Sequence, residues 1–234
     1  MTRLAAAVDG QGGLTRNRPV DPARAALLFI DIQNFSLFPG RGEWSHVDPN
    51  NIPAELAYYF QRVNDLVLPN AARLRAAFRR AGAEVMYTVI ECLTKDGRDR
   101  GLDYKITGFL VPKGSPDAQL PEQLPPGDDE IIIPKSTSSV FNSTNIDFLL
   151  RNLEIDYLVV AGLITDQCVE SAVRDACDRG FLVTLVTDAC ATYSLERHEA
   201  SLKALKGYCR QATTAELEAE LDRLAHTAPP QGNI

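Results

Sequence analysis

Short runs of almost unbroken apolar residues, separated by segments with helical periodicity, constrain the fold of this chain more than any other feature. The run at 25–30 has no polar face, which is typical of a parallel strand that is buried on both sides. Strands that alternate with helices form βαβ units, which build a parallel sheet with helices on both faces. We therefore predict a single-domain α/β fold of this kind. Its strands are expected at 25–31, 84–90, 131–135, 156–161 and 181–187, with a short edge strand at 209–213.

The segments between these runs are predicted to be helices or long loops. Pro69 lies inside the first helical segment, at 55–80, and is expected to kink or divide it because proline has no N–H to donate. The segment 91–129 is rich in charged residues, Gly and Pro, and connections of this length usually have a function. We expect it to form either a lid over a site or a contact between subunits. Further helices are expected at 144–152, 167–180, 195–206 and 214–225.

The two ends of the chain differ in composition from the part between them. Residues 1–24 are polar and contain Gly, Asn and Pro, so we expect an N-terminal arm, either a loose tail or an arm across a neighbouring subunit. Residues 227–234 are expected to form a flexible tail. Because no linker-like stretch interrupts residues 25–226, we predict a single domain there.

Charge and cysteine content exclude several classes of protein. A net charge of −7 argues against a nucleic-acid partner, since phosphate binding needs a basic surface. No apolar run approaches the ~20 residues of a membrane span, and the first residues do not have the pattern of a signal peptide. The number of cysteines, five, is odd, and no two of them form a CxxC pair. This favours reduced thiols over a framework of disulfides. We therefore expect a cytoplasmic protein that binds a small molecule and neither nucleic acid nor a membrane.

Three residues with useful chemistry, Asp31, Lys135 and Cys168, follow predicted strands. The carboxyl ends of parallel strands lie at one edge of a sheet, so residues far apart in sequence can meet there. Each residue alone has an ordinary explanation, as a turn former, a solvated cation or a small hydrophobic side chain. Their occurrence at corresponding points favours a site. Cys168 also precedes a helix, where unpaired N–H groups are expected to lower the pKa of a thiol.

The chemistry of these three residues is coherent. Cys168 would be the nucleophile, and Asp31 would take its proton and later deliver it to a leaving amine. The cation of Lys135 would hold both groups and favour their charged forms. Backbone N–H groups of Thr165 and Cys168 are the expected donors of an oxyanion hole.

Three segments carry a further signal: LFIDIQN at 28–34, IPK at 133–135 and GLITDQCVES at 162–171. Together, and over about residues 24–220, they resemble the cysteine hydrolase family, also called isochorismatase-like hydrolases. The resemblance implies a catalytic triad of the same Asp, Lys and Cys, a six-stranded parallel sheet and a cis peptide bond before Thr165. It also implies a homo-oligomer, either a dimer or a tetramer.

Departures from individual branches of the family narrow the expected activity. Nicotinamidases bind a metal through an Asp and two His near the site, whereas the segment 91–96 contains no His, and His46 with Asp48 alone makes a poor site. We therefore expect no metal and no other cofactor. Isochorismatases of the siderophore type act on a vinyl ether and can lack the nucleophilic cysteine. Cys168 in its motif favours amide hydrolysis through a thioester, although vinyl-ether hydrolysis remains an alternative.

Among the amidases, the chain most resembles those that act on ureides. The segment 113–120 is similar to one in ureidoacrylate hydrolases, and Gln211 falls where biuret hydrolases use a glutamine to bind the urea group. A glutamine amide can donate and accept, as a urea group does, but an ordinary edge-strand role for Gln211 is equally open. Either Arg98 or Arg100 could bind a substrate carboxylate. The expected walls of the pocket are Asn34, Phe35, Phe141 and Tyr193.

These observations predict a metal-independent amidohydrolase that cleaves a C–N bond of a small linear ureide and releases ammonia. Biuret-like or triuret-like compounds are the first choice of substrate, ureidoacrylate- or N-carbamoyl-type acids the second, and nicotinamide-like amides the last. The alternative from another class is a family member that binds a metabolite without catalysis. The reactivity of the Cys168 thiol toward alkylation would separate these alternatives.

Overall fold

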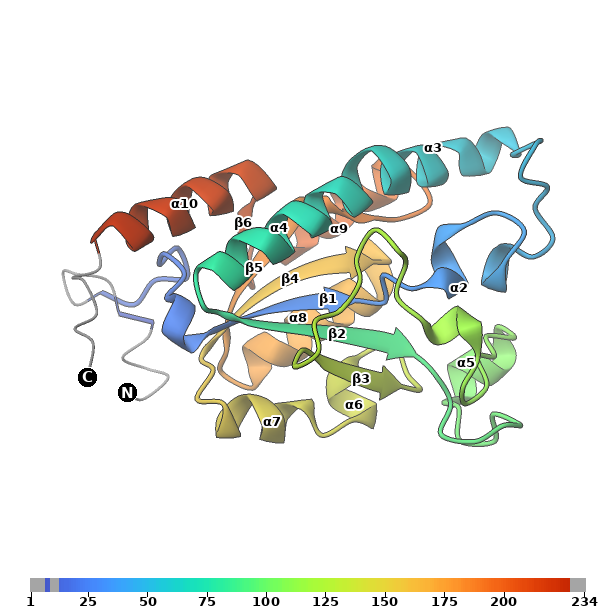
Figure 1. Ribbon diagram of the computed structural model, residues 1–234, viewed down its shortest axis with the longest axis horizontal. Helices are drawn as coiled ribbons and strands as arrows, with labels where there is room; N and C mark the ends of the chain where they lie inside the picture. The colour runs from blue at the N-terminus through green and yellow to red at the C-terminus, as the bar shows by residue number, and fades with distance from the viewer. Residues whose placement is uncertain (1–6, 9–12, 228–234) are drawn as a thin grey trace.

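The computed structural model describes residues 7–8 and 13–227, so most of the predicted C-terminal tail lies outside the described residues (Figure 1). Its centre is a parallel six-stranded sheet in the order β3-β2-β1-β4-β5-β6. This confirms the predicted α/β fold. Five strands lie where the apolar runs predicted them, and the sixth is the short edge strand. The strands are β1 (Ala25–Ile30), β2 (Glu84–Ile90), β3 (Ile131–Lys135), β4 (Tyr157–Leu163), β5 (Leu182–Ala191) and β6 (Arg210–Ala212).

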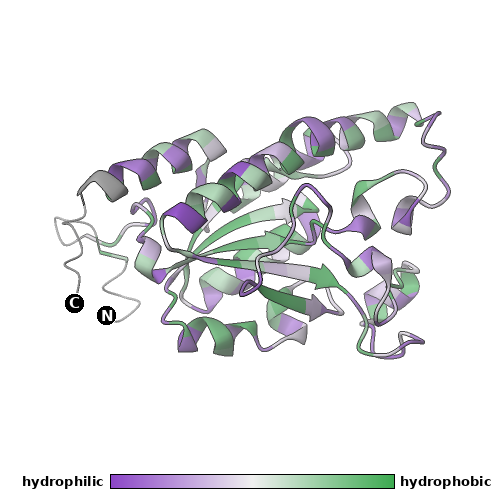
Figure 2. Ribbon diagram, in the orientation of Figure 1, coloured by the Kyte–Doolittle hydropathy of each residue, from purple (hydrophilic) through white to green (hydrophobic). Residues whose placement is uncertain are grey.

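Helices cover both faces of the sheet and bury its apolar side chains in two clusters (Figure 1). Figure 2 shows the hydrophobic strands between helices whose outer sides are hydrophilic. Because both faces are covered, the strands need no polar face, which explains their unbroken apolar runs. On one face lie α3 (Ala54–Arg62), α4 (Leu68–Arg80) and α10 (Thr214–Thr227), and on the other α6 (Val140–Ser143), α7 (Ile146–Asn152), α8 (Glu170–Asp178) and α9 (Leu195–Leu205).

The order of the strands reverses between β1 and β4, which are neighbours in the sheet. A crevice opens beyond the carboxyl ends of strands at such a point, and ligands bind there in open α/β sheets. Gly162 of β4 lies opposite Ile30 of β1. Its φ is +134°, and a Cβ atom there would lie 2.1 Å from the Ile30 carbonyl oxygen. The two strands can therefore meet at this point only because residue 162 is glycine.

Replacing Gly162 with Ala is expected to lower the free energy of unfolding by more than about 3 kcal/mol, because the strained φ and the collision with Ile30 add together. Gly82 provides a matched control, since its φ is +70° but nothing lies within 4 Å of an added Cβ. Gly82→Ala is expected to cost only about 1 kcal/mol. Denaturant unfolding of both variants measures the difference, and equal losses would contradict the role of the close approach.

The predicted division of the long helix at Pro69 is confirmed. A π-helical turn, Val63–Val67, joins α3 to α4, and Pro69 lies in the first turn of α4. The Leu68 N–H donates to the Val63 carbonyl across this turn. Because Pro69 has no N–H, the regular hydrogen-bond ladder cannot pass through this position, and the wider turn takes its place.

Two of the differences between the predicted and the observed segments concern β5 and the loop 136–142. β5 continues to Ala191 past its expected end at residue 187, with an irregular register against β4 near Gly162. The Asp188 carboxylate therefore lies within a strand, where it accepts from the N–H and hydroxyl of Thr214 and caps α10. The second difference lies in the predicted loop 136–142, where the short helix α6 begins after the Ser139 cap.

The described part of the N-terminal arm packs against its own chain. The Val20 N–H donates to the Glu220 carboxylate at 2.7 Å, and the Tyr157 hydroxyl donates to the Arg18 carbonyl at 2.9 Å. Val20 itself is buried. Residues 13–24 are therefore anchored on the domain that follows them.

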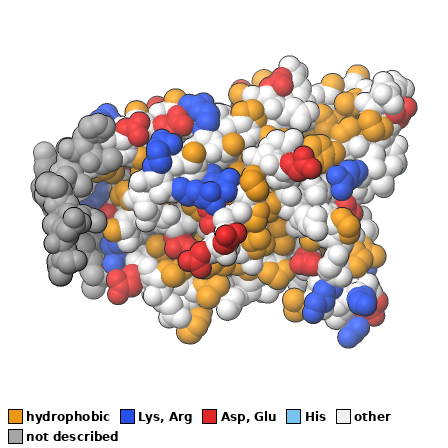
Figure 3. All heavy atoms as spheres, viewed as in Figure 1, with side chains coloured by type: hydrophobic (Ala, Val, Ile, Leu, Met, Phe, Trp, Pro, Cys, Tyr) orange, Lys and Arg blue, Asp and Glu red, His pale blue; other side chains and the backbone are white. Residues whose placement is uncertain are grey.

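The surface mixes charges of both signs. Figure 3 shows Lys and Arg side chains next to acidic ones on one face of the molecule, with hydrophobic side chains between them. Within the described residues, no helix combines the length and the hydrophobicity that crossing a membrane requires.

Candidate active site

The side chains of Asp31, Lys135 and Cys168 meet at the carboxyl edge of the sheet. Asp31 follows β1, Lys135 is the last residue of β3, and Cys168 lies in the π-helical turn Thr165–Val169 after β4. The Lys135 Nζ atom lies 2.8 Å from Asp31 Oδ2 and 3.5 Å from Cys168 Sγ. The three residues are 2%, 1% and 6% exposed, respectively. A carboxylate, an ammonium and a thiol are thus in contact in a nearly dry environment.

Asp31 is held by the neighbouring strand β2. Its backbone has a φ of +53°, which a non-glycine residue adopts only where the surroundings impose it. The Asp31 N–H donates to the Thr88 carbonyl at 3.1 Å, and the Thr88 hydroxyl donates to Asp31 Oδ1 at 2.7 Å. Thr88 therefore fixes one carboxylate oxygen and leaves the other facing the ammonium and the thiol.

Lys135 is a fixed cation. Its ammonium donates to the Thr137 carbonyl at 2.9 Å and to the Tyr104 hydroxyl at 3.1 Å, besides its contact with Asp31. Burial lowers the pKa of Lys135, but the charges of Asp31 and Cys168 outweigh burial and raise it above its usual value. The ammonium therefore keeps its proton and acts through its charge.

The pKa of Cys168 corrects the prediction that the helix N-terminus would lower it. Burial raises the pKa of this thiol to about 11; Lys135 opposes the rise and Asp31 adds to it. The prediction was wrong because the thiol is shielded from water and lies beside a carboxylate, and both disfavour a thiolate. The resting group is therefore a thiol, which has to lose its proton during a reaction.

Tyr104 is a member of the site that the sequence did not predict. It lies in α5 (Leu102–Ile106), inside the long segment 91–129, and its hydroxyl is 3.7 Å from Cys168 Sγ. Burial raises the pKa of Tyr104 well above its usual value, so it stays a phenol. Tyr104 is 3% exposed, whereas Leu102 and Ile106 on either side are 74% and 75% exposed. The only signal for Tyr104 in the sequence was its place as the aromatic residue of the charge-dense run 96–105. Because Tyr104 is buried against Cys168, this part of the long segment covers the thiol.

Replacing Tyr104 with Phe is expected to slow alkylation of Cys168 several-fold at pH 8. The Tyr104 hydroxyl lowers the pKa of this thiol, so its loss raises the pKa further and leaves less thiolate. Iodoacetamide labelling followed by peptide mass spectrometry measures this rate for each cysteine. Tyr208→Phe, at a half-exposed tyrosine, serves as the control and is expected to leave the rate unchanged.

A cavity of about 460 Å³ opens beside Cys168. It contains both hydrogen-bonding and aromatic side chains, as small-molecule sites do. Of the predicted pocket walls, Tyr193 lines it directly. Phe35 packs edge-on against Phe109 with a centroid distance of 5.4 Å, so it supports the wall from behind. The lining residues are Asp103, Tyr104, Thr107, Phe109, Ser138, Gln167, Cys168 and Tyr193.

The structure does not bring the other predicted substrate contacts to this cavity. Gln211 lies opposite Leu185 in the sheet, away from the carboxyl edge, and donates to the Leu202 carbonyl at 2.5 Å. The Phe141 ring packs 6.1 Å from that of Phe181, beyond the end of α8 that is remote from Cys168. These two positions correct the prediction, and both side chains serve packing.

Three other predicted contacts are engaged elsewhere. The Asn34 amide donates to the Pro116 carbonyl at 3.2 Å and ties α2 (Asn34–Leu37) to the long segment. Arg100 donates to the Phe109 carbonyl at 2.7 Å and to the Gly97 carbonyl, while Arg98 pairs with an exposed aspartate. Neither arginine lines the cavity, so neither is placed to bind a substrate carboxylate.

Glu43, another residue near the site that the sequence did not single out, is half-buried, and its Oε1 atom is shielded from solvent. It lies in the 3₁₀ turn Gly42–Trp44. Burial raises its pKa to about 8; a hydrogen bond with Ser36 opposes this rise, and the charge of Asp31 adds to it. Its carboxyl therefore carries a proton for much of the time at neutral pH.

The described residues do not form a metal site. They contain no group of three or more His, Cys, Asp and Glu side chains that could hold an ion. His46 and Asp48, the only pair that the sequence offered, are both exposed. The residues that the structure describes therefore do not fit a metal centre.

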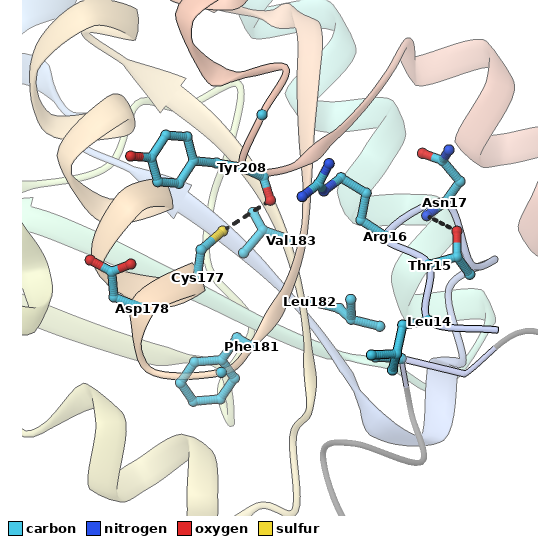
Figure 4. Close-up of a pocket in the computed structure, with 13 residues that line it drawn as sticks. Leu14, Thr15, Arg16, Asn17, Cys177, Asp178, Phe181, Leu182, Val183 and Tyr208 are labelled. Carbon is cyan, nitrogen blue, oxygen red and sulfur yellow. Dashed lines mark hydrogen bonds between the residues drawn. The ribbon is translucent and has the colours of Figure 1, made fainter.

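A larger cavity, of about 770 Å³, lies at the opposite edge of the sheet (Figure 4). The N-terminal arm, from Leu14 to Asn17, forms one side, and Leu182 and Val183 at the start of β5 form another. Its polar contacts include the hydrogen bond from the Cys177 thiol to a backbone carbonyl. Because strands begin at this edge, the larger cavity is separate from the three converging side chains.

Comparisons with known proteins agree with this fold and site. The isochorismatase domain matches residues 25–217. N-carbamoylsarcosine amidase from Arthrobacter sp is 31% identical over 163 residues, or 68% of this chain, which spans just over half (56%) of that enzyme's length. Nicotinamidase 3 from Arabidopsis thaliana is 29% identical over 195 residues, covering 82% of this chain and 85% of the enzyme.

A solved structure extends the likeness to three dimensions. The cysteine hydrolase from Pseudomonas syringae pv. phaseolicola 1448A superposes with a TM-score of 0.74, covering 88% of this chain and 96% of that one, at 23% identity. It shares the fold. The cis peptide bond that the resemblance implied before Thr165 lies one residue earlier, between Leu163 and Ile164. Because the domain match covers most of the sequence and the six-stranded sheet agrees with it, this chain belongs to the isochorismatase family of hydrolases.

Proposed function

We propose that this protein is an amidohydrolase that cleaves a C–N bond of a small linear ureide through a thioester on Cys168 and releases ammonia. The observation that carries the proposal is the contact of the Lys135 ammonium with both the Asp31 carboxylate and the Cys168 thiol, beside a cavity. A nucleophile, a proton carrier and a fixed cation are the parts that such a reaction needs.

The first step joins the Cys168 sulfur to the carbonyl carbon of the substrate. Because the thiol has a pKa of about 11, its proton leaves as the bond forms, and Asp31 accepts it. The carbonyl electrons move to the oxygen and give a tetrahedral oxyanion. The proposed donors to this oxyanion are the N–H groups of Thr165 and Cys168. The N–H groups of Gln167 and Val169 in the same turn are not available for this role, because both donate to the Ile164 carbonyl.

The second step breaks the C–N bond. Asp31 returns its proton to the departing nitrogen, ammonia leaves, and the carbonyl re-forms as a thioester. A water molecule then attacks this thioester while Asp31 takes one of its protons, and the thiolate leaves and is reprotonated. Lys135 holds its charge throughout and keeps the carboxylate and sulfur in place.

The proposed substrates follow from the size and lining of the cavity. A hollow of about 460 Å³ suits a small molecule, and Asp103, Ser138 and Gln167 offer acceptors and donors for amide groups. The similarity to an N-carbamoylsarcosine amidase supports C–N hydrolysis. We rank biuret-like or triuret-like compounds first, ureidoacrylate- or N-carbamoyl-type acids second and nicotinamide-like amides last. A cytoplasmic homo-oligomer, a dimer or a tetramer, completes the proposal.

Ammonia release from biuret, triuret, ureidoacrylate, N-carbamoylglycine and nicotinamide tests this function. The expected result is release from at least one ureide by the unsubstituted protein and none by Cys168→Ala. Release from nicotinamide alone would overturn the choice of substrate, and release that survives Cys168→Ala would overturn the mechanism. A chelator is expected to change nothing; activity lost with chelator and restored by zinc would overturn the metal-independent proposal.

A further inference from the structure

His198 is a buried histidine that the proposed reaction does not use. It lies on α9 and contacts two residues from other parts of the chain. Its Nε2 atom is 2.9 Å from the Arg62 guanidinium, and its Nδ1 atom is 2.9 Å from the Thr165 hydroxyl. His198 and Thr165 are both almost inaccessible to solvent. The imidazole thus links a cation at the end of α3 to the turn that contains Cys168.

The contact with Arg62 determines the tautomer of His198. A guanidinium can only donate, so Nε2 has to accept and carries no proton. The proton of the neutral ring is then on Nδ1, from which it is donated to the Thr165 hydroxyl oxygen. Burial and the charge of Arg62 lower the pKa of His198 to about 4, so the neutral form persists at working pH.

Arg62 is itself fixed by the end of β5. Its guanidinium donates to the Cys190 carbonyl at 2.8 Å and to the Thr187 carbonyl at 2.9 Å, in addition to His198. These acceptors belong to the sheet and cannot easily move. Arg62 therefore orients the imidazole from the rigid core, much as a carboxylate orients a catalytic histidine in other enzymes.

Two residues of α9, His198 and Ser201, contact Thr165. Ser201 lies three residues after His198 on the same face of that helix, and its hydroxyl lies 3.4 Å from the Thr165 carbonyl oxygen. The Ser201 hydroxyl also contacts the Glu170 carboxylate at 2.6 Å, at the start of α8. The side chain and the carbonyl of Thr165 thus each have a partner on one helix.

We infer that His198 is a positioning residue that, oriented by Arg62, holds the turn containing Cys168 so that the backbone N–H groups of this turn face the oxyanion of the reaction. The inference rests on the proposed function, since it concerns the oxyanion of the same thiol. An oxyanion hole acts only on a tetrahedral species, so its donors must be aligned before the reaction begins. The fixed link from Arg62 through His198 to Thr165 supplies this alignment.

A test that needs no knowledge of the substrate uses acetaldehyde, whose carbonyl adds to the Cys168 thiol. The S–C bond forms and the thiol proton moves to oxygen, which gives a tetrahedral thiohemiacetal. Titration with ¹³C-labelled acetaldehyde followed by NMR measures its dissociation constant. His198→Leu is expected to weaken this adduct about tenfold, while iodoacetamide alkylation of Cys168, which forms no oxyanion, stays within about twofold.

Two polar replacements of His198 separate its two hydrogen bonds. Asparagine places a donor near the position of Nδ1 and is expected to retain most of the adduct affinity. Glutamine places an acceptor near Nε2, so it keeps the contact with Arg62, loses the one with Thr165 and is expected to resemble His198→Leu. Thr165→Val is expected to weaken the adduct as much as His198→Leu, and the double variant no further.

Additive losses, or equal losses of adduct formation and alkylation, would show a merely structural role and overturn the inference. An unsubstituted protein that forms no adduct would overturn it as well, because no oxyanion hole would then exist at this turn. Ammonia release by the unsubstituted protein decides the proposed function separately. A protein that forms the adduct but hydrolyses no amide would retain the positioning role and lose the proposed activity.

Discussion

Replacing Asp31 with Asn is expected to reduce kcat/KM for ammonia release by about 10²- to 10⁴-fold, the range that a general acid–base catalyst contributes. Asparagine keeps the size of the side chain and its contact with Thr88, but it cannot take the thiol proton. With a pKa of about 11, only about one Cys168 in 10⁴ is ionised at pH 7, so a reaction without a base starts from a very rare species.

The same substitution is expected to change alkylation of Cys168 in the opposite direction. The charge of Asp31 raises the pKa of the thiol, so its removal lowers that pKa and increases the thiolate fraction at a given pH. Iodoacetamide labelling is therefore expected to become faster as hydrolysis becomes slower. Asp128→Asn, at an exposed carboxylate that does not line the cavity, is the control and is expected to leave hydrolysis within about twofold. Hydrolysis and alkylation that fall together would indicate damage to the site and contradict the proposed role of Asp31.

The fold could be predicted from the sequence because its strands are short and apolar throughout. A run such as 25–30 can be buried on both sides only in the middle of a covered sheet, and its end is marked by the first charged residue, Asp31. Once strands and helices alternate, right-handed connections place all carboxyl ends at one edge. That Asp31, Lys135 and Cys168 lie close together could therefore be predicted without knowledge of side-chain packing.

The remainder of the site depends on features that periodicity does not carry. Gln211 and Phe141 were placed correctly along the chain, but their side chains point to a helix and to the remote end of α8. Tyr104 reaches the thiol from a five-residue helix with no apolar pattern of its own. Tertiary contacts set the register of a three-residue strand, the direction of its side chains and the conformation of a long loop.

The pKa of Cys168 shows the same limit for electrostatics. The position of the cysteine near a helix start was visible in the sequence, and that feature alone favours a thiolate. The degree of burial and the approach of Asp31 were not visible, and in the structure they raise the pKa of Cys168 more than Lys135 and Tyr104 lower it. The outcome is a thiol that needs its base, which makes Asp31 and Lys135 more important to the reaction than an ionised cysteine would.

Lys135 is the residue whose loss is expected to affect both stability and activity. Replacing it with Met, which keeps much of its volume, leaves the Asp31 carboxylate buried without a cation. Removing one partner of a buried ion pair costs about 3–5 kcal/mol, because the remaining charge is uncompensated. Denaturant unfolding at pH 7 is expected to show a loss of this size, together with loss of ammonia release. Lys206→Met, at an exposed lysine, is the control and is expected to stay within about 0.5 kcal/mol.

The double variant Asp31→Asn with Lys135→Met separates charge from packing. If the cost of Lys135→Met arises from the unpaired carboxylate, then removing that carboxylate as well should restore much of the lost stability, since two neutral side chains of similar shape remain. Activity is not expected to return, because the proton carrier is gone. A double variant as unstable as the single one would show that Lys135 supports the fold through its hydrogen bonds to Thr137 and Tyr104, and the ion pair would then be dispensable for stability.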